Sequence, residues 1–261
     1  MGQTSVLALL DRADRTASLP RLGGMARVDG VVIVSERFWA FAGVDGSLRE
    51  GLMPQTPRTL RHVPLLRGLV RLGASLSPLF RRSGVTRRRE RWFLLAAIFA
   101  PLALLFAPNW IGLAAGLVTA VALLGWVVRG RTLYLHGAEH RAIAAAEQRR
   151  LCDTWSGAVR PSRFSLRCGT NFAVLMLPIT TIGERVWTLP TAAFTPLVVT
   201  VLALAVSMEL WQIVQTSPVK LARVFLVPGL VLQRVTTREP ELDETRVALR
   251  AVASVLRREL P

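Results

Sequence analysis

A run of 37 consecutive residues without a charged side chain, Trp92 to Val128, constrains the fold of this chain more than any other feature. A helix needs roughly 20 apolar residues to cross a bilayer core of about 30 Å, so the run is too long for one span and long enough for two. Pro108 and Asn109 form a turn signal inside it. The run therefore predicts a transmembrane hairpin of two helices, Trp92 to Ala107 and Trp110 to Val128.

A second apolar region follows this hairpin. It comprises a short part, Asn171 to Ile182, and a longer part, Thr191 to Val214, which only Glu209 and Gln212 interrupt. We interpret these parts as two further spans. The predicted fold class is therefore mainly α, a polytopic helical membrane protein with about four transmembrane helices.

The basic residues support one orientation of these spans, because Lys and Arg near membrane helices gather on the cytoplasmic side. Of the 33 Lys and Arg, 16 lie in residues 1–91, eight in 129–170 and eight in 215–261, which leaves only Arg185. The sequence thus predicts a multi-pass protein of the cytoplasmic (inner) membrane with both termini in the cytoplasm. The three basic segments are cytoplasmic in this layout, and residues 92–128 and 171–214 form the two hairpins.

The formal net charge of +16 is explained by this orientation and by contacts with anionic lipid headgroups. Each basic residue near such a surface contributes about 1 kcal/mol to membrane binding. No basic motif interleaved with aromatic residues is present, so nucleic acid is not an expected partner. Residues 1–20 contain only a brief apolar stretch, Val6 to Leu10, so no cleaved signal peptide is expected. Protein partners of the cytoplasmic segments stay open.

The cytoplasmic segments themselves have the patterns of folded structure. Val31 to Ala42 is rich in β-branched and aromatic residues and precedes a turn signal at Asp45-Gly46, with a further short extended stretch expected after it. This pattern predicts a small β element. Leucines recur at helical spacing after Pro64, which predicts an amphipathic helix lying on the membrane or on the β element. Pro240 is followed by an acidic turn, an apolar stripe and two arginines, the charge order of a helix.

The histidines give the strongest chemical signal. His136 and His140 are four residues apart, so on a helix they share a face and could hold one metal ion. Glu139 lies between them, and the order His-x-x-Glu-His is that of the inverted zincin motif, in which the glutamate is a general base toward water. This spacing predicts a metal site with Glu139 as the catalytic base and zinc as the preferred divalent ion.

A zinc enzyme normally supplies three protein ligands, and the spacing leaves the third open among Glu147, Cys168 and Glu209. Glu147 lies on the same helical face as His140, and Cys168 could supply a thiolate if the loop before it folds back toward the histidines. Glu209 lies toward the cytoplasmic end of the fourth span, where it either reaches the membrane interface or joins the histidines. In the alternative interpretation the histidines bind no metal and hydrogen-bond to headgroups or glutamates.

Several blocks of the sequence together resemble the YqhQ-like family of bacterial membrane proteins. The blocks cover nearly the whole chain in order, and the last is the most specific: Gly23-Gly24, Pro64-Leu65-Leu66-Arg67-Gly68, His136 to His140 with Glu147, Arg167 to Phe172, Glu209, and Pro228 to Pro240. The resemblance implies a multi-pass membrane protein from a domain family of unknown function, labelled in places as a predicted metal-dependent enzyme. It also implies a polar cluster of nine residues: His136, Glu139, His140, Glu147, Arg167, Cys168, Thr170, Arg238 and Glu239.

This chain departs from the family pattern in ways that bear on the site. Ser165-Leu166 replaces the family's His-Pro, and Ala144 stands where some members carry a histidine. Two hypotheses follow. The first is a metal-dependent, hydrolase-like enzyme at the cytoplasmic membrane interface. The second is a non-enzymatic membrane scaffold or regulator whose polar cluster is structural, and a transporter is a weaker third because no pair of broken helices is present.

Overall fold

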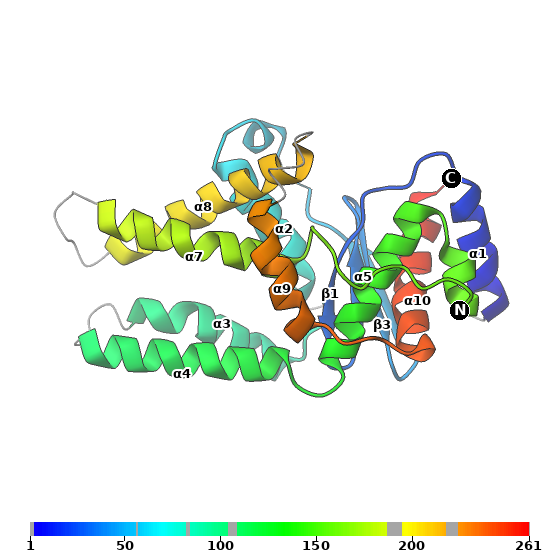
Figure 1. Ribbon diagram of the computed structural model, residues 1–261, viewed down its shortest axis with the longest axis horizontal. Coiled ribbons are helices and arrows are strands. Elements are labelled where there is room, and N and C mark those ends of the chain that lie inside the picture. Colours follow the sequence, from blue (N-terminus) through cyan, green and yellow to red (C-terminus); the bar gives the residue numbers. More distant parts are fainter. Residues whose placement is uncertain are drawn as a thin grey trace.

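The computed structural model describes residues 3–55, 57–81, 84–103, 109–186, 195–217 and 224–260. The described chain is mainly helical, with one small antiparallel sheet near the N-terminus. Figure 1 shows two regions along the long axis: the sheet with its covering helices at one end, and long helices projecting from it at the other. The candidate site residues lie where these regions meet.

The sheet is a four-stranded antiparallel meander in the order β1-β2-β3-β4. Its strands are β1 (Gly23–Arg27), β2 (Gly30–Val34), β3 (Phe38–Gly43) and β4 (Leu48–Leu52). Gly46 has a φ of +85° in the turn after β3, a conformation that glycine adopts without steric cost. The predicted β element is therefore confirmed, with β4 in the extended stretch expected after the turn, and it includes one strand, β1, that the sequence pattern did not indicate.

Successive side chains of each strand point to opposite faces of the sheet, and each face packs in a different apolar cluster. Val31, Ile33, Ala40 and Ala42 face a large cluster to which α1 (Gln3–Arg15), α5 (Thr132–Gln148) and α10 (Leu242–Glu259) contribute. The opposite face forms a smaller cluster around Trp39. Because α5 packs directly on the sheet, its buried side chains have fixed positions.

The C-terminal helix α10 forms where the acidic turn predicted it. Glu241 and Glu244 form a reciprocal capping box, and Arg257 and Arg258 lie in the last turn. The short helix α6 (Leu151–Ser156) and α1 were not predicted, because neither carries a long apolar period. Both pack against the large cluster through residues such as Leu10 and Leu151.

The predicted amphipathic helix is confirmed as α2 (Leu66–Phe80), which follows a 3-10 turn, η1 (Arg58–Arg61). It packs mainly on α8 (Thr195–Thr216), where a Cβ on Gly68 would lie 2.7 Å from the Met208 Cβ. Its far end reaches the β element, since Leu79 packs on the cluster around Trp39. The helix therefore joins the sheet to the long helices.

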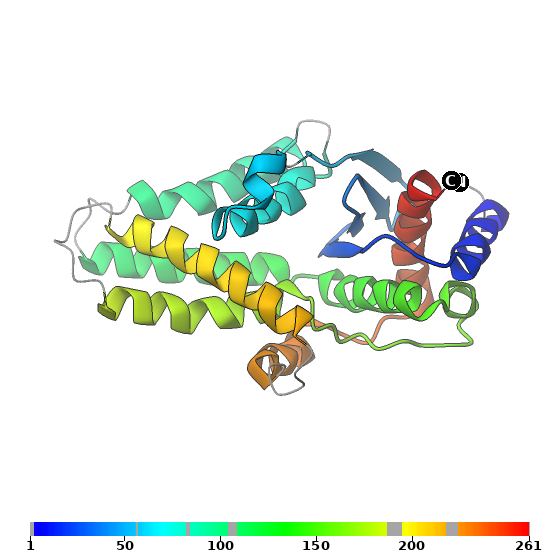
Figure 2. The same ribbon diagram turned by 90° about the horizontal axis from the view of Figure 1, so that it is seen from above.

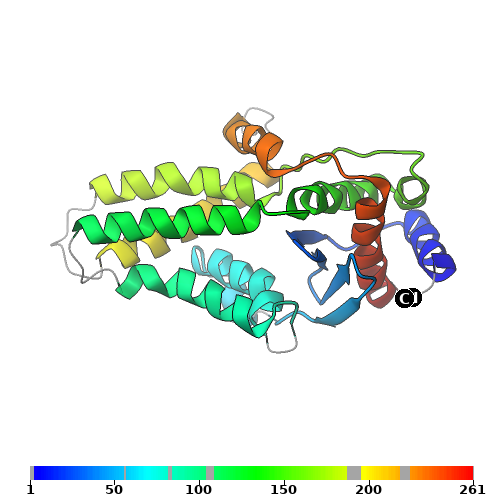
Figure 3. The same cartoon turned by 90° about the horizontal axis from the view of Figure 1, so that it is seen from below.

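Two helical hairpins form the projecting region, as Figures 1, 2 and 3 show. One is α3 (Arg88–Ala103) with α4 (Asn109–Val127), and the other is α7 (Gly169–Val186) with α8. Within the described ranges, one helix is long and apolar enough to cross a membrane by length and composition, Leu197–Gln215 in α8. The predicted turn at Pro108 and the start of the longer apolar part, residues 191–194, lie outside the described residues.

A short helix, α9 (Val227–Thr236), packs across α7 and completes the junction. Gly229 permits this packing, because a Cβ there would lie 2.6 Å from the Asn171 Cα. The chain then runs back along α5 through residues 237–241 to reach α10. Three segments that are far apart in sequence, α5, the loop before α7 and the end of α9, thus meet at one place.

Candidate metal centre

Helix α5 carries both histidines and the glutamate between them into the protein interior. Glu139 and His140 are buried, and His136 is partly buried. Gly137 lets the chain after α9 approach closely, because a Cβ at this position would lie 2.2 Å from the Arg238 carbonyl oxygen. The backbone N–H of Arg238 donates to the Leu133 carbonyl at 2.9 Å, which fixes this segment against α5.

Hydrogen bonds to the main chain set the tautomer of both imidazoles. His136 Nδ1 lies 2.9 Å from the Thr236 carbonyl oxygen, and His140 Nδ1 lies 2.7 Å from the Arg163 carbonyl oxygen. A carbonyl oxygen can only accept, so each Nδ1 carries a proton, and in the neutral imidazole this leaves the lone pair on Nε2. Metal-binding histidines are oriented in this way in most metalloproteins.

Cys168 provides a sulfur atom beside these nitrogens. It precedes the first turn of α7, where its carbonyl accepts the N–H of Asn171 at 3.0 Å. Its Sγ lies 3.2 Å from the Thr170 hydroxyl and 3.5 Å from the Thr170 N–H, both of which can donate to sulfur. The sulfur therefore lies beside a helix N-terminus with two hydrogen-bond donors directed at it, and cysteine sulfur is an ordinary zinc ligand.

The three donor groups converge on one point. Ligand atoms of His136, His140 and Cys168 all lie within 4.8 Å of one another, and the Cys168 Sγ is 3.3 Å from the His136 Nε2. In a tetrahedral zinc site with bonds of about 2.0 to 2.3 Å, neighbouring ligand atoms are about 3.5 Å apart. The donor set and its spacing therefore fit a divalent ion with two nitrogens, one sulfur and one open position.

Glu139 lies beside this donor set in an apolar environment. Burial raises its pKa to about 7, and the nearby His136 ring opposes the increase. Within the described segments no hydrogen bond or ion pair engages its carboxyl group. The side chain presses on β1, since a Cβ on Gly24 would lie 2.7 Å from the Glu139 Cγ. Gly24 thus provides space for the glutamate.

The other predicted cluster residues lie around the donor set. Glu147 forms an ion pair with Arg167 at the surface, so its carboxylate is directed to a guanidinium. Glu209 lies on α8, where it pairs with Arg67 and accepts the Leu65 N–H at 3.1 Å. Neither glutamate is among the convergent donors of the described chain. Of the three candidates for a third ligand, the structure brings only Cys168 to the histidines.

Arg238 and Glu239 close the cluster from the C-terminal side. Arg238 contributes its backbone, while the Glu239 carboxylate pairs with Arg141 and lies 3.4 Å from the Arg163 Nε. Arg141 is buried and also donates to the carbonyls of Pro161 and Pro240, each at 3.1 Å. This arginine therefore ties both flanking segments to α5.

Sequence reasoning missed Arg141, Arg163 and Gly24 as supporting residues. An arginine next to His140 on an otherwise apolar helix face is a signal that could have identified Arg141. The carbonyls of Thr236 and Arg163 had no such signal, because main-chain acceptors are present at every residue. Ser165, at the position of the family's histidine, takes part in holding the loop: its N–H donates to the Gln233 Oε1 at 2.9 Å, and its carbonyl accepts from the Gln233 Nε2 at 2.8 Å.

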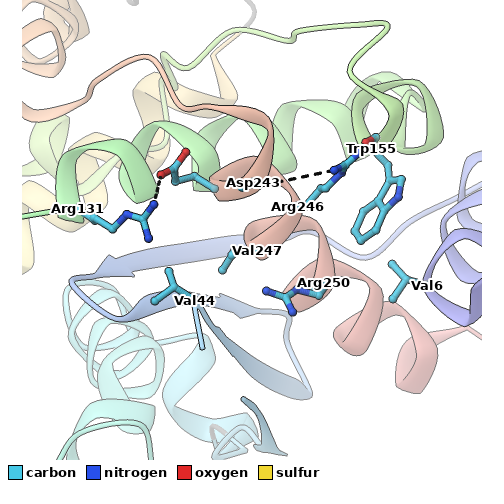
Figure 4. A pocket seen from close by; sticks show the side chains of 9 residues that line it. Val6, Val44, Arg131, Trp155, Asp243, Arg246, Val247 and Arg250 are labelled. Atoms are coloured by element: carbon cyan, nitrogen blue, oxygen red, sulfur yellow. Dashed lines mark hydrogen bonds and ion pairs between the residues drawn. The ribbon is translucent and has the colours of Figure 1, made fainter. Parts of the chain in front are cut away.

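A cavity of about 360 Å³ lies elsewhere, between α1, α10 and the turn after β3. Figure 4 shows its lining, where Arg131 and Arg246 are engaged in ion pairs with Glu244 at 3.2 Å and Asp243 at 3.8 Å. The convergent donors do not line this cavity in the described chain. The cluster of convergent donors is thus separate from it.

Comparisons with known proteins identify the family. Residues 105–258, more than half of the chain, match the family described as "Protein of unknown function (DUF1385)". The chain is also 30% identical over 140 residues to the uncharacterized protein YqhQ of Bacillus subtilis (strain 168), an alignment that covers 49% of this chain and 42% of that protein. No solved structure matches. The matched region contains α5, the Cys168 loop and α9, so the chain belongs to the DUF1385 family and is YqhQ-like.

Proposed function

We propose that this chain is an integral membrane protein with a divalent-metal centre at the cytoplasmic face of the membrane. Zinc is the preferred ion, and the centre performs hydrolysis. The ligands are His136, His140 and Cys168, and Glu139 is the general base. One observation carries the proposal: a ring nitrogen of each imidazole and the Cys168 sulfur lie within 4.8 Å of one another, while main-chain carbonyls accept from both Nδ1 atoms. Two imidazoles with a thiolate favour zinc over magnesium or calcium.

The residues around the centre have separate roles in this proposal. A bound zinc ion supplies Lewis acidity and lowers the pKa of water. Glu139 accepts the proton of the attacking water, and its pKa of about 7 suits proton transfer at neutral pH. Thr170 holds the thiolate, and Arg141 holds the loop and the chain after α9 in place.

The membrane part of the proposal comprises four spans, α3, α4, α7 and α8, with cytoplasmic segments at 1–91, 129–170 and 215–261. The distribution of Lys and Arg supports this orientation. In the apolar window of α8 only 33% of the residues are buried, whereas a core helix of a soluble protein is mostly buried. Anionic lipid headgroups are the expected partners of the basic segments.

Metal content tests the proposal directly. Protein purified in mild detergent without chelator is analysed by mass spectrometry, alongside a His136→Ala, His140→Ala double variant. We expect about one equivalent of zinc in the wild type and background metal in the variant. A His62→Ala variant is the matched control, because His62 is exposed and is not among the convergent donors. Background metal in the wild type would contradict the enzyme proposal.

A non-enzymatic scaffold or regulator is the second candidate, and one observation favours it. The Cys168 thiol can donate to the His136 Nε2 at 3.3 Å while accepting from Thr170, so these three side chains can satisfy one another's hydrogen bonds without metal. On this alternative the double variant loses stability and no metal is found in either protein. The same metal analysis therefore separates the two candidates.

A further inference from the structure

Helix α9 has its apolar face on the outside. Four apolar side chains of α9, Val227, Val231, Leu232 and Val235, and two in the turn before it, Val224 and Phe225, are between 39% and 65% exposed, whereas the polar Gln233 is fully buried. Gly229 and Leu226 share the buried side with Gln233, against α7 and α8. This is the reverse of the pattern on a helix that faces water, where polar residues lie outside.

The outward face of α9 matches a lipid surface in its chemistry. Val224–Thr236 is an apolar helical stretch without an acidic residue, and the basic residue within it, Arg234, is exposed. The helix packs on α7, whose exposed face includes Leu177, and lies near the α8 end that exposes Ile213. Figure 1 shows α9 crossing the base of α7 instead of following its direction. An apolar stripe bordered by basic charge is typical of helices that lie in the plane of a membrane.

The buried side of α9 holds the candidate metal centre together. The Thr236 carbonyl at its C-terminus accepts from the His136 Nδ1 at 2.9 Å. Gln233 forms two hydrogen bonds with the backbone of Ser165, in the loop that leads to Cys168. The same helix therefore orients one ligand and positions the loop of another.

We propose that α9 lies in the surface of an anionic lipid bilayer, with its apolar face in the acyl-chain boundary, and that this seating maintains the geometry of the metal centre. The second part rests on the proposed function. Removal of α9 from lipid would release the Thr236 carbonyl and the Gln233 contacts together. The loss of such outer hydrogen bonds typically weakens metal affinity about 10- to 100-fold.

Cysteine labelling tests the seating independently of any metal. Val231→Cys and Val235→Cys are made in a Cys152→Ser background and incorporated into nanodiscs of phosphatidylglycerol and phosphatidylethanolamine, which leave both faces accessible. The control is Val44→Cys, because Val44 is 39% exposed and lies after β3, whereas Val231 and Val235 are 53% and 65% exposed. Exposure alone predicts faster reaction of the α9 cysteines with a bilayer-excluded maleimide. We expect them to react at least about tenfold more slowly than the control, and equal or faster reaction would overturn the seating.

Zinc affinity in the same nanodiscs tests the coupling to the site. A Val231→Gln, Val235→Gln double variant changes only outward-facing side chains of α9, and Val44→Gln is its control. We expect zinc affinity to fall about tenfold or more in the double variant and to stay unchanged in the control. Unchanged affinity in the double variant overturns the coupling. A wild type that binds no zinc refutes the proposed function and the coupling, while the labelling result still decides the seating.

Discussion

Replacing Glu139 with Gln should make the metal-free protein more stable toward unfolding, and this gain should depend on pH. A glutamate whose native pKa is raised binds a proton more tightly in the folded state than in the unfolded state. The loss of folding stability caused by ionising this buried glutamate is therefore small at low pH and grows as the pH rises from about 4.5 through about 7. Since a glutamate in the unfolded chain has an ordinary pKa of 4.5 and the native pKa is about 7, this loss reaches about 3 kcal/mol at pH 8, at about 1.4 kcal/mol per tenfold change.

Thermal unfolding in mild detergent with EDTA, at several pH values between 5 and 8, measures this effect. We expect Glu139→Gln to unfold at a higher temperature than the wild type at pH 8, with the difference shrinking toward pH 5. Glu147→Gln is the matched control, because Glu147 lies on the same helix but is exposed and paired with Arg167. Parallel profiles for the wild type and Glu139→Gln would refute the reasoning that Glu139 is buried without compensation.

Two further substitutions test the contacts that build the centre. Gly137→Ala should lower the free energy of unfolding by about 1–3 kcal/mol, because the added Cβ would lie 2.2 Å from a carbonyl oxygen. Gly73 has open space around it, so the control Gly73→Ala should not destabilise the protein in the same thermal assay. Thr170→Val should weaken metal binding about tenfold by removing a donor to the sulfur, measured by cobalt titration through the sulfur-to-metal absorption band. Thr180→Val, on the same helix but bonded to a helix carbonyl, should leave the titration unchanged.

The sequence predicted those parts of the fold that depend on local periodicity. Leucine spacing after Pro64 predicted α2, and the acidic turn after Pro240 predicted α10. The β-branched residues from Val31 predicted strands, but Gly23–Arg27 has little strand character and pairs because β2 is beside it. The extra strand β1 thus results from tertiary context.

The candidate site was predictable only where side-chain type carries information. The spacing of His136 and His140 gave the shared helix face, and Cys168 was one of three possible third ligands. Spacing could not choose among the three, because the choice depends on a loop that folds back onto α5 and on Arg167, which pairs with Glu147. The outward apolar face of α9 was missed because a basic segment was interpreted as uniformly cytoplasmic.

The hydrogen bond from His136 to the Thr236 carbonyl joins residues 100 positions apart in the sequence and has a consequence for biogenesis. During synthesis α5 leaves the ribosome long before α9, and the hairpin of α7 and α8 lies between them. His136 therefore has no partner for its Nδ1 proton until that hairpin has been made and α9 has packed on it. Because domains form in the order of synthesis where their contacts allow, the centre is among the last parts of the molecule to mature. A chain interrupted before residue 236 would retain all three donor side chains and still lack the group that orients the first of them.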